Sequence, residues 1–276
     1  MSSIQDSSHR LANAAQLQVD LSPPPVLDTL TIGAGRVTVV REDLLPGGTK
    51  QRALLPYLSD ALAGGCRSFV YASPPPGYAQ VALAYVAQRL GVGCTVFGEL
   101  TGAGSLHEYS RLARSYGATV HPAPSLAAAE ADAAAHAATV PDCCRLPLGF
   151  GDACFMAHYR AALTRAWTRI VEELGHLPRR VWLPVGSATL ATVFRQVVPA
   201  ETTLLCVNVR VLARDDARLR RLAQLPGVVL RHVPELFHEP CATPVPIPSN
   251  EHYDAKLWRL VRDQGSDRDL WWNVAR

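Results

Sequence analysis

A lysine directly after a glycine turn is the residue of this sequence best suited to covalent chemistry. Lys50 follows two glycines and a threonine, with a β-branched, strand-like run at 37–40 before it and apolar residues at helical spacing over 51–58 after it. We therefore expect Lys50 at the start of a helix, where the helix dipole disfavours an extra positive charge. An ammonium there loses its proton more easily and can act as an imine-forming nucleophile. The alternative is an ordinary surface lysine, but the chain has just two lysines, Lys50 and Lys256.

A turn of small residues is a candidate anion site. Between an apolar, strand-like run and a helical stretch lie Gly186, Ser187, Ala188 and Thr189. Backbone N–H groups at such a turn, the helix N-terminus and the hydroxyls of Ser187 and Thr189 can together hold a phosphate. The alternative is a serine that caps an ordinary helix. A dinucleotide site has less support, because the segment 33–35 lacks the third glycine and the following helix of that fingerprint.

The run 41–50, which starts with Arg-Glu-Asp and ends with the glycine turn and Lys50, resembles the pyridoxal-phosphate enzymes of fold type II. This is the tryptophan synthase beta-like group, and the run is most similar to its aminocyclopropane-carboxylate deaminase and D-cysteine desulfhydrase branch. The resemblance implies that the cofactor is pyridoxal 5′-phosphate and that Lys50 forms the Schiff base. It also implies that residues 186–189 are the phosphate loop, with Ala188 in place of a usual glycine. It covers roughly residues 37–273.

Two further segments are similar to family contacts. In the loop at 73–80, Tyr78 stands where the family has asparagine, and three prolines stiffen the approach, so the usual grip on the substrate carboxylate is altered. The resemblance implies that Tyr78 bonds the cofactor O3′ or stacks on the substrate, unless it merely caps the helix, and Gln80 is the other polar candidate. The segment at 252–258 is similar to the Tyr-x-Gly-Lys element of the same branch, with Ala255 in place of glycine.

The second of these segments supplies two expected functional residues. The resemblance implies that Tyr253 lies near the bound amino acid as an acid or base. It implies that Asp254 faces the pyridine nitrogen and keeps it protonated, which makes the ring an electron sink. The alternative for Asp254 is an acidic residue favoured by the dipole at a helix N-terminus. Lys256 is expected to be structural.

Alternating strands and helices are expected to position these residues. Strand-like runs followed by helical stretches recur through the chain, as at 69–72 and 78–90, and predict parallel sheets with helices on both faces. Helices are also expected at 126–139 and 153–174, with a linker between them at 146–152.

The fold class is therefore α/β, with two parallel-sheet domains of the fold type II kind. A large cofactor-binding domain is expected from residues 1–50 and 147–276, and a small α/β domain from residues 51–146. A cleft should separate the two domains.

Composition excludes several classes of protein. A chain of 276 residues with 48% hydrophobic content can bury a large core, and a net charge of +3 is well below that of a dedicated nucleic-acid binder. Seven cysteines, mostly in apolar runs without a CxxC spacing, favour reduced thiols in a cytoplasmic protein over disulfides or zinc. No signal peptide or long apolar run supports secretion, membrane insertion or a membrane partner. No histidine pairs at ligand spacing with a carboxylate and a second histidine, so no metal site is expected.

The resemblance to fold type II enzymes, together with Lys50 and the turn at 186–189, implies a pyridoxal-phosphate-dependent lyase of the decarboxylase or deaminase type. Its chemistry would start by exchanging the Lys50 imine for one with an amino-acid-type substrate, followed by cleavage of a bond at Cα. One alternative is a deaminase or desulfhydrase of a free small amino acid. An alternative of another class is a non-catalytic carrier of the cofactor or a small-ligand binding protein. A homodimer is expected.

The run 42–50, the compact length and the ending at 270–274 also resemble phage-encoded members linked to thymidine hypermodification. This resemblance implies an amine that belongs to an amino acid joined to a thymine methyl group in DNA, in the cytoplasm of a host cell. A DNA substrate needs phosphate contacts, for which one region offers Arg210, Arg214, Arg218, Arg220, Arg221 and Arg231. The alternative is a solvated helix face with Asp215 and Asp216.

Overall fold

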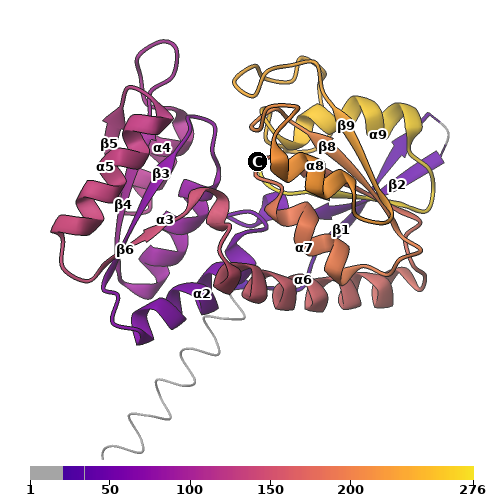
Figure 1. The fold of residues 1–276 in the computed structure, drawn as a ribbon. Coiled ribbons are helices and arrows are strands. Elements are labelled where there is room, and N and C mark those ends of the chain that lie inside the picture. The colour runs from indigo at the N-terminus through magenta and orange to yellow at the C-terminus, as the bar shows by residue number, and fades with distance from the viewer. Residues whose placement is uncertain (1–20, 34) are drawn as a thin grey trace, which may run out of the picture.

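The computed structural model describes residues 21–33 and 35–276, which build two α/β units on two separate sheets (Figure 1). The six-stranded sheet has the order β1-β2-β10-β7-β8-β9, and the four-stranded sheet has the order β5-β4-β3-β6. The first sheet contains β1 (Leu27–Ile32), β2 (Gly35–Arg41), β7 (Arg180–Val185), β8 (Thr203–Asn208), β9 (Val228–His232) and β10 (Asp269–Asn273). The second contains β3 (Ser68–Ser73), β4 (Gly93–Glu99), β5 (Thr119–Ala123) and β6 (Cys143–Leu146). Residues 1–20, which the sequence prediction assigns to the large domain, lie outside the described residues.

Neighbouring strands in the two sheets are parallel except for the β1–β2 hairpin, which is antiparallel. Parallel neighbours need crossover connections, and helices supply them here. The α/β prediction is therefore confirmed. The antiparallel edge strand β1 was not predicted, and neither were β6 and β10.

Helices cover the sheets and connect their strands. They are α2 (Gln51–Ala63), α3 (Ala79–Leu90), α4 (Glu108–Ser115), α5 (Leu126–Thr139), α6 (Ala153–Leu174), α7 (Thr189–Val197), α8 (Ala217–Ala223) and α9 (Trp258–Gln264). Short 3₁₀ helices are η1 (Glu42–Leu44), η2 (Leu148–Phe150) and η3 (Asp254–Leu257). The predictions for α5 and α6 match the observed bounds, because alanine-rich and amphipathic stretches of this length have high helix propensity.

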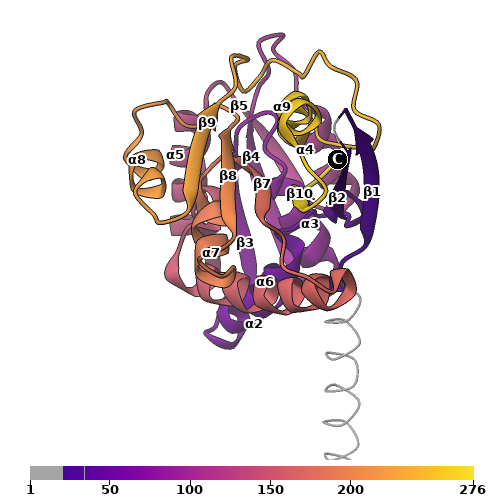
Figure 2. The same cartoon turned by 90° about the vertical axis from the view of Figure 1, so that its right-hand side faces the viewer.

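Helix α6 joins the two units. Figures 1 and 2 show it running along the lower side of the molecule, where it packs against α2 of the small unit and α7 of the large one. Asp152 caps its first turn by accepting a hydrogen bond from the N–H of Phe155 at 2.8 Å. Phe155, Tyr159 and Trp167 are buried on its inner face, so α6 is a shared wall for both cores.

Strand β10 connects the core of the large unit to the reactive lysine. It lies between β2 and β7, all its residues are buried, and the side chains of Trp271 and Trp272 are fully buried. The indole Nε1 of Trp272 donates to the hydroxyl of Thr49 at 2.8 Å. The residue before Lys50 is therefore fixed by the centre of the sheet.

A buried ion pair fixes the other side of the same turn. The guanidinium of Arg52 donates from two nitrogens to the two carboxylate oxygens of Glu42, both at 2.6 Å. Both side chains are almost inaccessible, and a paired arrangement of this kind holds a defined geometry because breaking it leaves a buried charge. The acidic residues before Lys50 thus anchor the turn.

The prediction of reduced cysteines is wrong for one pair. Cys66 and Cys144 form a disulfide with their Cα atoms 5.9 Å apart. Cys66 lies just before β3, and the parallel pairing of β3 with β6 places Cys144 opposite Phe69. The two residues are separated by 78 positions, so the pairing has no local sequence signal. In the described part of the chain, no helix has the length and apolar character needed to cross a membrane.

Candidate functional site

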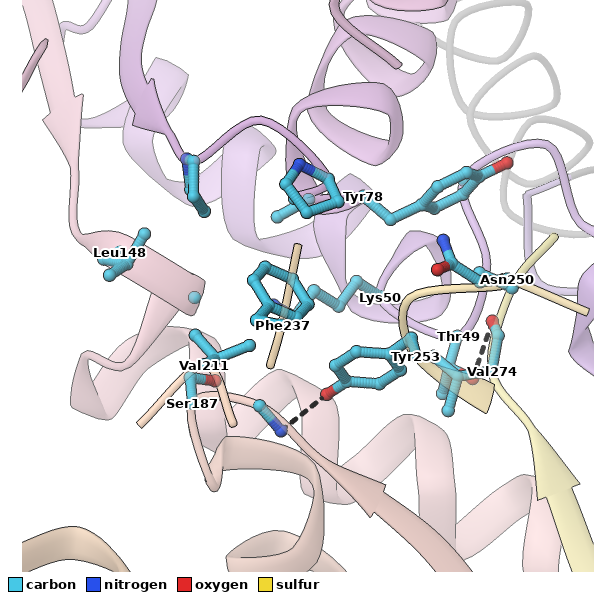
Figure 3. Close-up of a pocket in the computed structure, with 18 of the residues that line it drawn as sticks. Thr49, Lys50, Tyr78, Leu148, Ser187, Val211, Phe237, Asn250, Tyr253 and Val274 are labelled. Atoms are coloured by element: carbon cyan, nitrogen blue, oxygen red, sulfur yellow. Dashed lines mark hydrogen bonds between the residues drawn. The ribbon is translucent and has the colours of Figure 1, made fainter. Parts of the chain in front are cut away.

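A cavity between the two units contains Lys50 (Figure 3). Its walls come from the turn before α2, the β3–α3 loop, the segment around η2, the β7–α7 turn and the irregular segment before η3. Several of these segments follow the carboxyl ends of parallel strands, where α/β sheets place their ligand sites. Of the described residues that line the cavity, only Lys50 has a charged side chain.

Lys50 lies at the N-cap position of α2, as the sequence predicts. Its Nζ is 5.3 Å from the centroid of the Phe150 ring, and the side chain extends into the middle of the cavity (Figure 3). Burial lowers the pKa of Lys50 to about 8. The physical cause is removal from water, which disfavours the charged form. With this pKa about a tenth of the amine is neutral, and so nucleophilic, at pH 7, far more than for a lysine at its ordinary pKa of 10.5.

The turn between β7 and α7 faces Lys50 from the large unit. The N–H of Gly186 donates to the phenolic oxygen of Tyr253 at 2.9 Å, so a phosphate at this turn would take the place of Tyr253 as the partner of that backbone donor. The hydroxyls of Ser187 and Thr189 lie 3.0 Å apart. Ala188 adopts the left-handed conformation with φ of 68°, which costs a residue with a Cβ about 1–2 kcal/mol and explains why glycine suits this position.

Close approach explains the glycine of this turn. A Cβ on Gly186 would lie 2.8 Å from ring and hydroxyl atoms of Tyr253. Gly186 and Ser187 line the cavity, whereas Ala188 and Thr189 are buried behind them at the start of α7. The turn therefore offers an anion two cavity-lining positions, backed by a helix N-terminus.

Tyr253 lines the cavity, as expected for a residue that contacts bound groups. Burial raises the pKa of its hydroxyl above the ordinary value of 10.0, with Asp254 raising it further. The hydroxyl is therefore a proton donor rather than a base at neutral pH.

Asp254 is not among the residues that line the cavity. Its side chain is fully buried, and its two oxygens accept hydrogen bonds from the N–H groups of Val274 at 2.7 Å and Ala275 at 3.1 Å. Burial raises the pKa of Asp254 well above its ordinary value, against the opposing effect of these two donors. Because Val274 and Ala275 do line the cavity, Asp254 holds its wall from behind.

The β3–α3 loop places its two predicted residues differently. Tyr78 lines the cavity, but its hydroxyl donates to the carbonyl oxygen of Pro46 at 3.1 Å and points away from Lys50 in Figure 3. Gln80 is buried outside the cavity lining, where it donates to the carbonyl oxygen of Gly77 and accepts from the hydroxyl of Ser110. Gln80 therefore shapes the loop.

The cavity also contains residues that the sequence alone did not single out. Asn250 donates to the hydroxyl of Tyr109 at 2.8 Å, which links the large unit to α4 of the small one. Tyr71, at the end of β3, accepts a hydrogen bond from the N–H of Gly149 at 3.2 Å. Phe237 and Asn250 lie in irregular segments, so no periodic pattern marks them. Tyr71 precedes the loop that the sequence did select, which is the one signal that pointed to it.

Lys256 is held away from the cavity lining. Its Nζ donates to the carbonyl oxygens of Leu236 at 2.6 Å and Phe237 at 3.4 Å. It fixes the segment that carries Phe237 into the cavity.

The cavity suits a flat aromatic aldehyde that carries a phosphate. The amine of Lys50, whose pKa is lowered, lies in the centre, and the turn at the N-terminus of α7 lies on one side. The aromatic side chains of Tyr253 and Phe150 lie near the lysine. Because the described residues of the lining include no second charged side chain, we expect backbone donors to carry most of the phosphate binding.

Comparisons with known proteins agree with this geometry. Residues 22–226 match the model of the family described as pyridoxal-phosphate dependent enzyme. A search of curated protein sequences gave no significant match.

Solved structures share the fold at low sequence identity. A homologue of ACC deaminase is 16% identical, with 95% of this chain and 94% of that chain covered and a TM-score of 0.73. An O-ureido-L-serine synthase is 16% identical, with 94% and 90% covered and a TM-score of 0.71. An O-acetylserine dependent cystathionine beta-synthase from Helicobacter pylori is 18% identical, with 94% and 95% covered and a TM-score of 0.66. Because the family match extends over most of the sequence, the chain belongs to the pyridoxal-phosphate dependent enzymes, of fold type II, and its cofactor is pyridoxal 5′-phosphate.

Proposed function

We propose that this protein is a pyridoxal-phosphate-dependent lyase that binds the amine of an amino-acid-type substrate through the cofactor and cleaves a bond at its Cα. The observation that carries the proposal is the position of Lys50 in the cavity, with a pKa lowered to about 8 by burial, opposite the donor turn at Gly186 and Ser187. When bound, the cofactor supplies an electron-withdrawing ring that stabilises negative charge at the substrate Cα.

The chain's own residues have separable roles in this proposal. Gly186 and Ser187 hold the phosphate, and Lys50 binds the aldehyde carbon and moves protons at the substrate, for which a pKa near 8 is well matched. Tyr253 donates a proton or a hydrogen bond in the cavity. We assign Asp254 to the pyridine nitrogen, which requires the ring to reach this carboxyl past the wall formed by Val274 and Ala275. A positively charged ring nitrogen beside it would lower the raised pKa of Asp254 and favour the carboxylate that holds the proton.

Whether the enzyme is a decarboxylase or a deaminase is tested by its products. The cofactor-loaded protein is incubated with a panel of free amino acids and with DNA bearing aminoacyl-modified thymine, and the products are analysed by mass spectrometry. Loss of carbon dioxide, or of ammonia, from one substrate supports a lyase. A change in the cofactor's visible spectrum without any product from the panel would favour the carrier or ligand-binding alternative.

A modified thymine in DNA is the second candidate substrate. Two observations favour it: prolines and Tyr78 replace the family's carboxylate-binding loop, and Arg214, Arg220, Arg221 and Arg231 are exposed. Against it, Arg218 is paired with Asp216 at 2.9 Å, as in an ordinary solvated helix. If modified DNA is the substrate, duplex DNA should bind the protein with an affinity that falls steeply as the salt concentration rises. If the substrate is a free amino acid, no such binding is expected.

Attachment of the cofactor should depend on pH through Lys50. Only the neutral amine is nucleophilic, so the rate of reaction with added pyridoxal phosphate should rise with pH up to about 8 and then level. A lysine at its ordinary pKa of 10.5 would give a rate that continues to rise above pH 9. Rapid-mixing absorbance measurements on cofactor-free enzyme distinguish the two profiles.

Placing a negative charge in the donor turn should weaken cofactor binding. In Ser187→Asp the new carboxylate repels the phosphate, so the affinity should fall at least about tenfold, which corresponds to about 1.4 kcal/mol. Ser187→Ala removes one hydroxyl without adding charge and is the matched control, with a smaller loss expected. Equilibrium titration followed by absorbance measures both. Unchanged affinity in folded Ser187→Asp would place the phosphate elsewhere.

A further inference from the structure

Outside the cavity, three side chains of metal-binding type converge on the seam between α2 and α6. Asp60 comes from α2, and Cys154 and His158 come from one face of α6, four positions apart. The Nε2 of His158 lies 2.6 Å from the Oδ2 of Asp60, and the Sγ of Cys154 lies 3.9 Å from the same oxygen. All three ligand atoms lie within 4.8 Å of one another.

These separations are close to what a tetrahedral zinc ion requires. With Zn–N and Zn–O distances of about 2.1 Å and a Zn–S distance of about 2.3 Å, tetrahedral angles place nitrogen and oxygen about 3.4 Å apart and sulfur about 3.6 Å from each of them. The observed 2.6 Å and 3.9 Å differ from these values by less than about 1 Å. The sulfur of Cys154 and the nitrogen of His158 lie within 4.8 Å of each other, against about 3.6 Å in a tetrahedral site. Side-chain rotations of the ligands, including Asp60, whose side chain is 60% exposed, would bring them into place.

The elements that carry the ligands are firmly positioned. The ring of Tyr57 on α2 packs edge-on against Phe155 on α6, with centroids 5.3 Å apart. The hydroxyl of Tyr57 donates to the carboxylate of Asp152, whose other oxygen caps α6. Asp152 is therefore already engaged and leaves the site to Asp60, Cys154 and His158.

The local electrostatics favour a cation over a reactive thiol. A carboxylate oxygen of Asp60 lies 3.9 Å from the Sγ of Cys154, so a free thiolate there would be repelled by a negative charge. A divalent cation reverses this effect, because it stabilises the thiolate and balances the nearby carboxylates.

We propose that Asp60, Cys154 and His158 form a binding site for a divalent transition metal ion of the zinc type. Sulfur, imidazole and carboxylate ligands together select such an ion over magnesium or calcium. Binding releases the thiol proton of Cys154 to solvent, and the fourth coordination position faces water. The ion would clamp α2, which begins next to Lys50, to α6, which joins the two units (Figure 1).

The prediction that there is no metal site rested on the spacing of histidines with carboxylates and other histidines. One ligand here is a cysteine in place of a second histidine, and the carboxylate lies 94 positions before that cysteine. The fold brings the ligands together through the packing of α2 on α6.

The test uses the full chain loaded with its cofactor, kept reduced and freed of metal by a chelator. Titration with Co²⁺ should give one equivalent bound and a thiolate-to-cobalt charge-transfer absorption in the difference spectrum. Titration calorimetry with Zn²⁺ should show the same stoichiometry. In Cys154→Ser the charge-transfer absorption should disappear and the Zn²⁺ affinity should fall at least about tenfold, as removal of a ligand must exceed the effect of altering its outer-shell partners.

Two further variants separate this site from other thiols and from a simple ion pair. Cys241→Ser replaces another free, partly buried cysteine and should leave Co²⁺ and Zn²⁺ binding unchanged. Asp60→Asn keeps a hydrogen-bonding group beside His158 but removes the carboxylate ligand, so it should weaken binding. Zn²⁺ should raise the Tm of the wild type and not that of Cys154→Ser. The proposal fails if the wild type gives no thiolate absorption with Co²⁺, or if Cys154→Ser binds Zn²⁺ as tightly as the wild type does.

Discussion

Lys50→Ala is expected to lose at least about a thousandfold in turnover, which corresponds to about 4 kcal/mol of the barrier. The variant removes the amine that binds the cofactor aldehyde and moves protons in the cavity. It also leaves the lining without a charged side chain among the described residues. Turnover of the product identified by mass spectrometry measures the loss. Noncovalent binding of the cofactor through the Gly186 turn should persist at reduced affinity.

Lys50→Arg and Lys256→Ala are the controls for this result. Arginine keeps a long cation at the helix start but stays protonated, so it cannot replace the nucleophile and should be as inactive as alanine. Lys256→Ala removes the other lysine, whose Nζ is bonded to Leu236 and Phe237, and should keep the covalent attachment. Substantial turnover in Lys50→Ala would show that Lys50 is not the essential amine.

Asp254→Ala is expected to keep the cofactor attached to Lys50 while turnover falls at least about a hundredfold. Attachment to the lysine does not require a protonated pyridine nitrogen, whereas stabilising negative charge at Cα does. A loss of about 2.7 kcal/mol of that stabilisation corresponds to two orders of magnitude in rate. Absorbance measures attachment and product analysis measures turnover in the same sample.

Asp254→Asn separates charge from support of the cavity wall. Asn keeps one oxygen that can accept from Val274 or Ala275 but cannot carry a negative charge. If Asp254 acts through its negative charge, Asp254→Asn should lose about as much turnover as Asp254→Ala. Near-normal turnover in Asp254→Asn, with a loss only in Asp254→Ala, would mean that Asp254 acts by supporting Val274 and Ala275. Normal turnover in Ala with attachment intact would remove Asp254 from the mechanism altogether.

Local sequence patterns predicted those parts of the fold that are set by local physics. The bounds of α5 and α6 follow from helix propensity and capping residues such as Asp152, and β7 follows from an apolar run. β10 was missed because it begins with a buried Asp269, which is acceptable only because Arg180 and Trp182 donate to it. Those contacts join residues nearly 90 positions apart, so no local pattern could show them.

The residues of the candidate site likewise fall into those marked by local sequence patterns and those placed by tertiary contacts. Lys50 and the turn at Gly186 and Ser187 are marked by small residues next to helix starts, and the structure places both at the cavity. Asn250 and Phe237 come from irregular segments whose course depends on tertiary contacts, including the bond from Asn250 to Tyr109. Burial also depends on residues far apart in the sequence, so the lowered pKa of Lys50 could be derived only from the folded structure.

The most direct test of the central claim is to reduce the cofactor-loaded enzyme with borohydride and locate the cofactor by peptide mass spectrometry. Reduction converts the linkage between the cofactor and its lysine into a stable secondary amine, so the modified peptide identifies the lysine. We expect cofactor on the peptide containing Lys50, unmodified Lys256, and no fixed cofactor in Lys50→Ala. Cofactor fixed on Lys256 in the wild type, or no cofactor fixed on either lysine, would contradict this expectation.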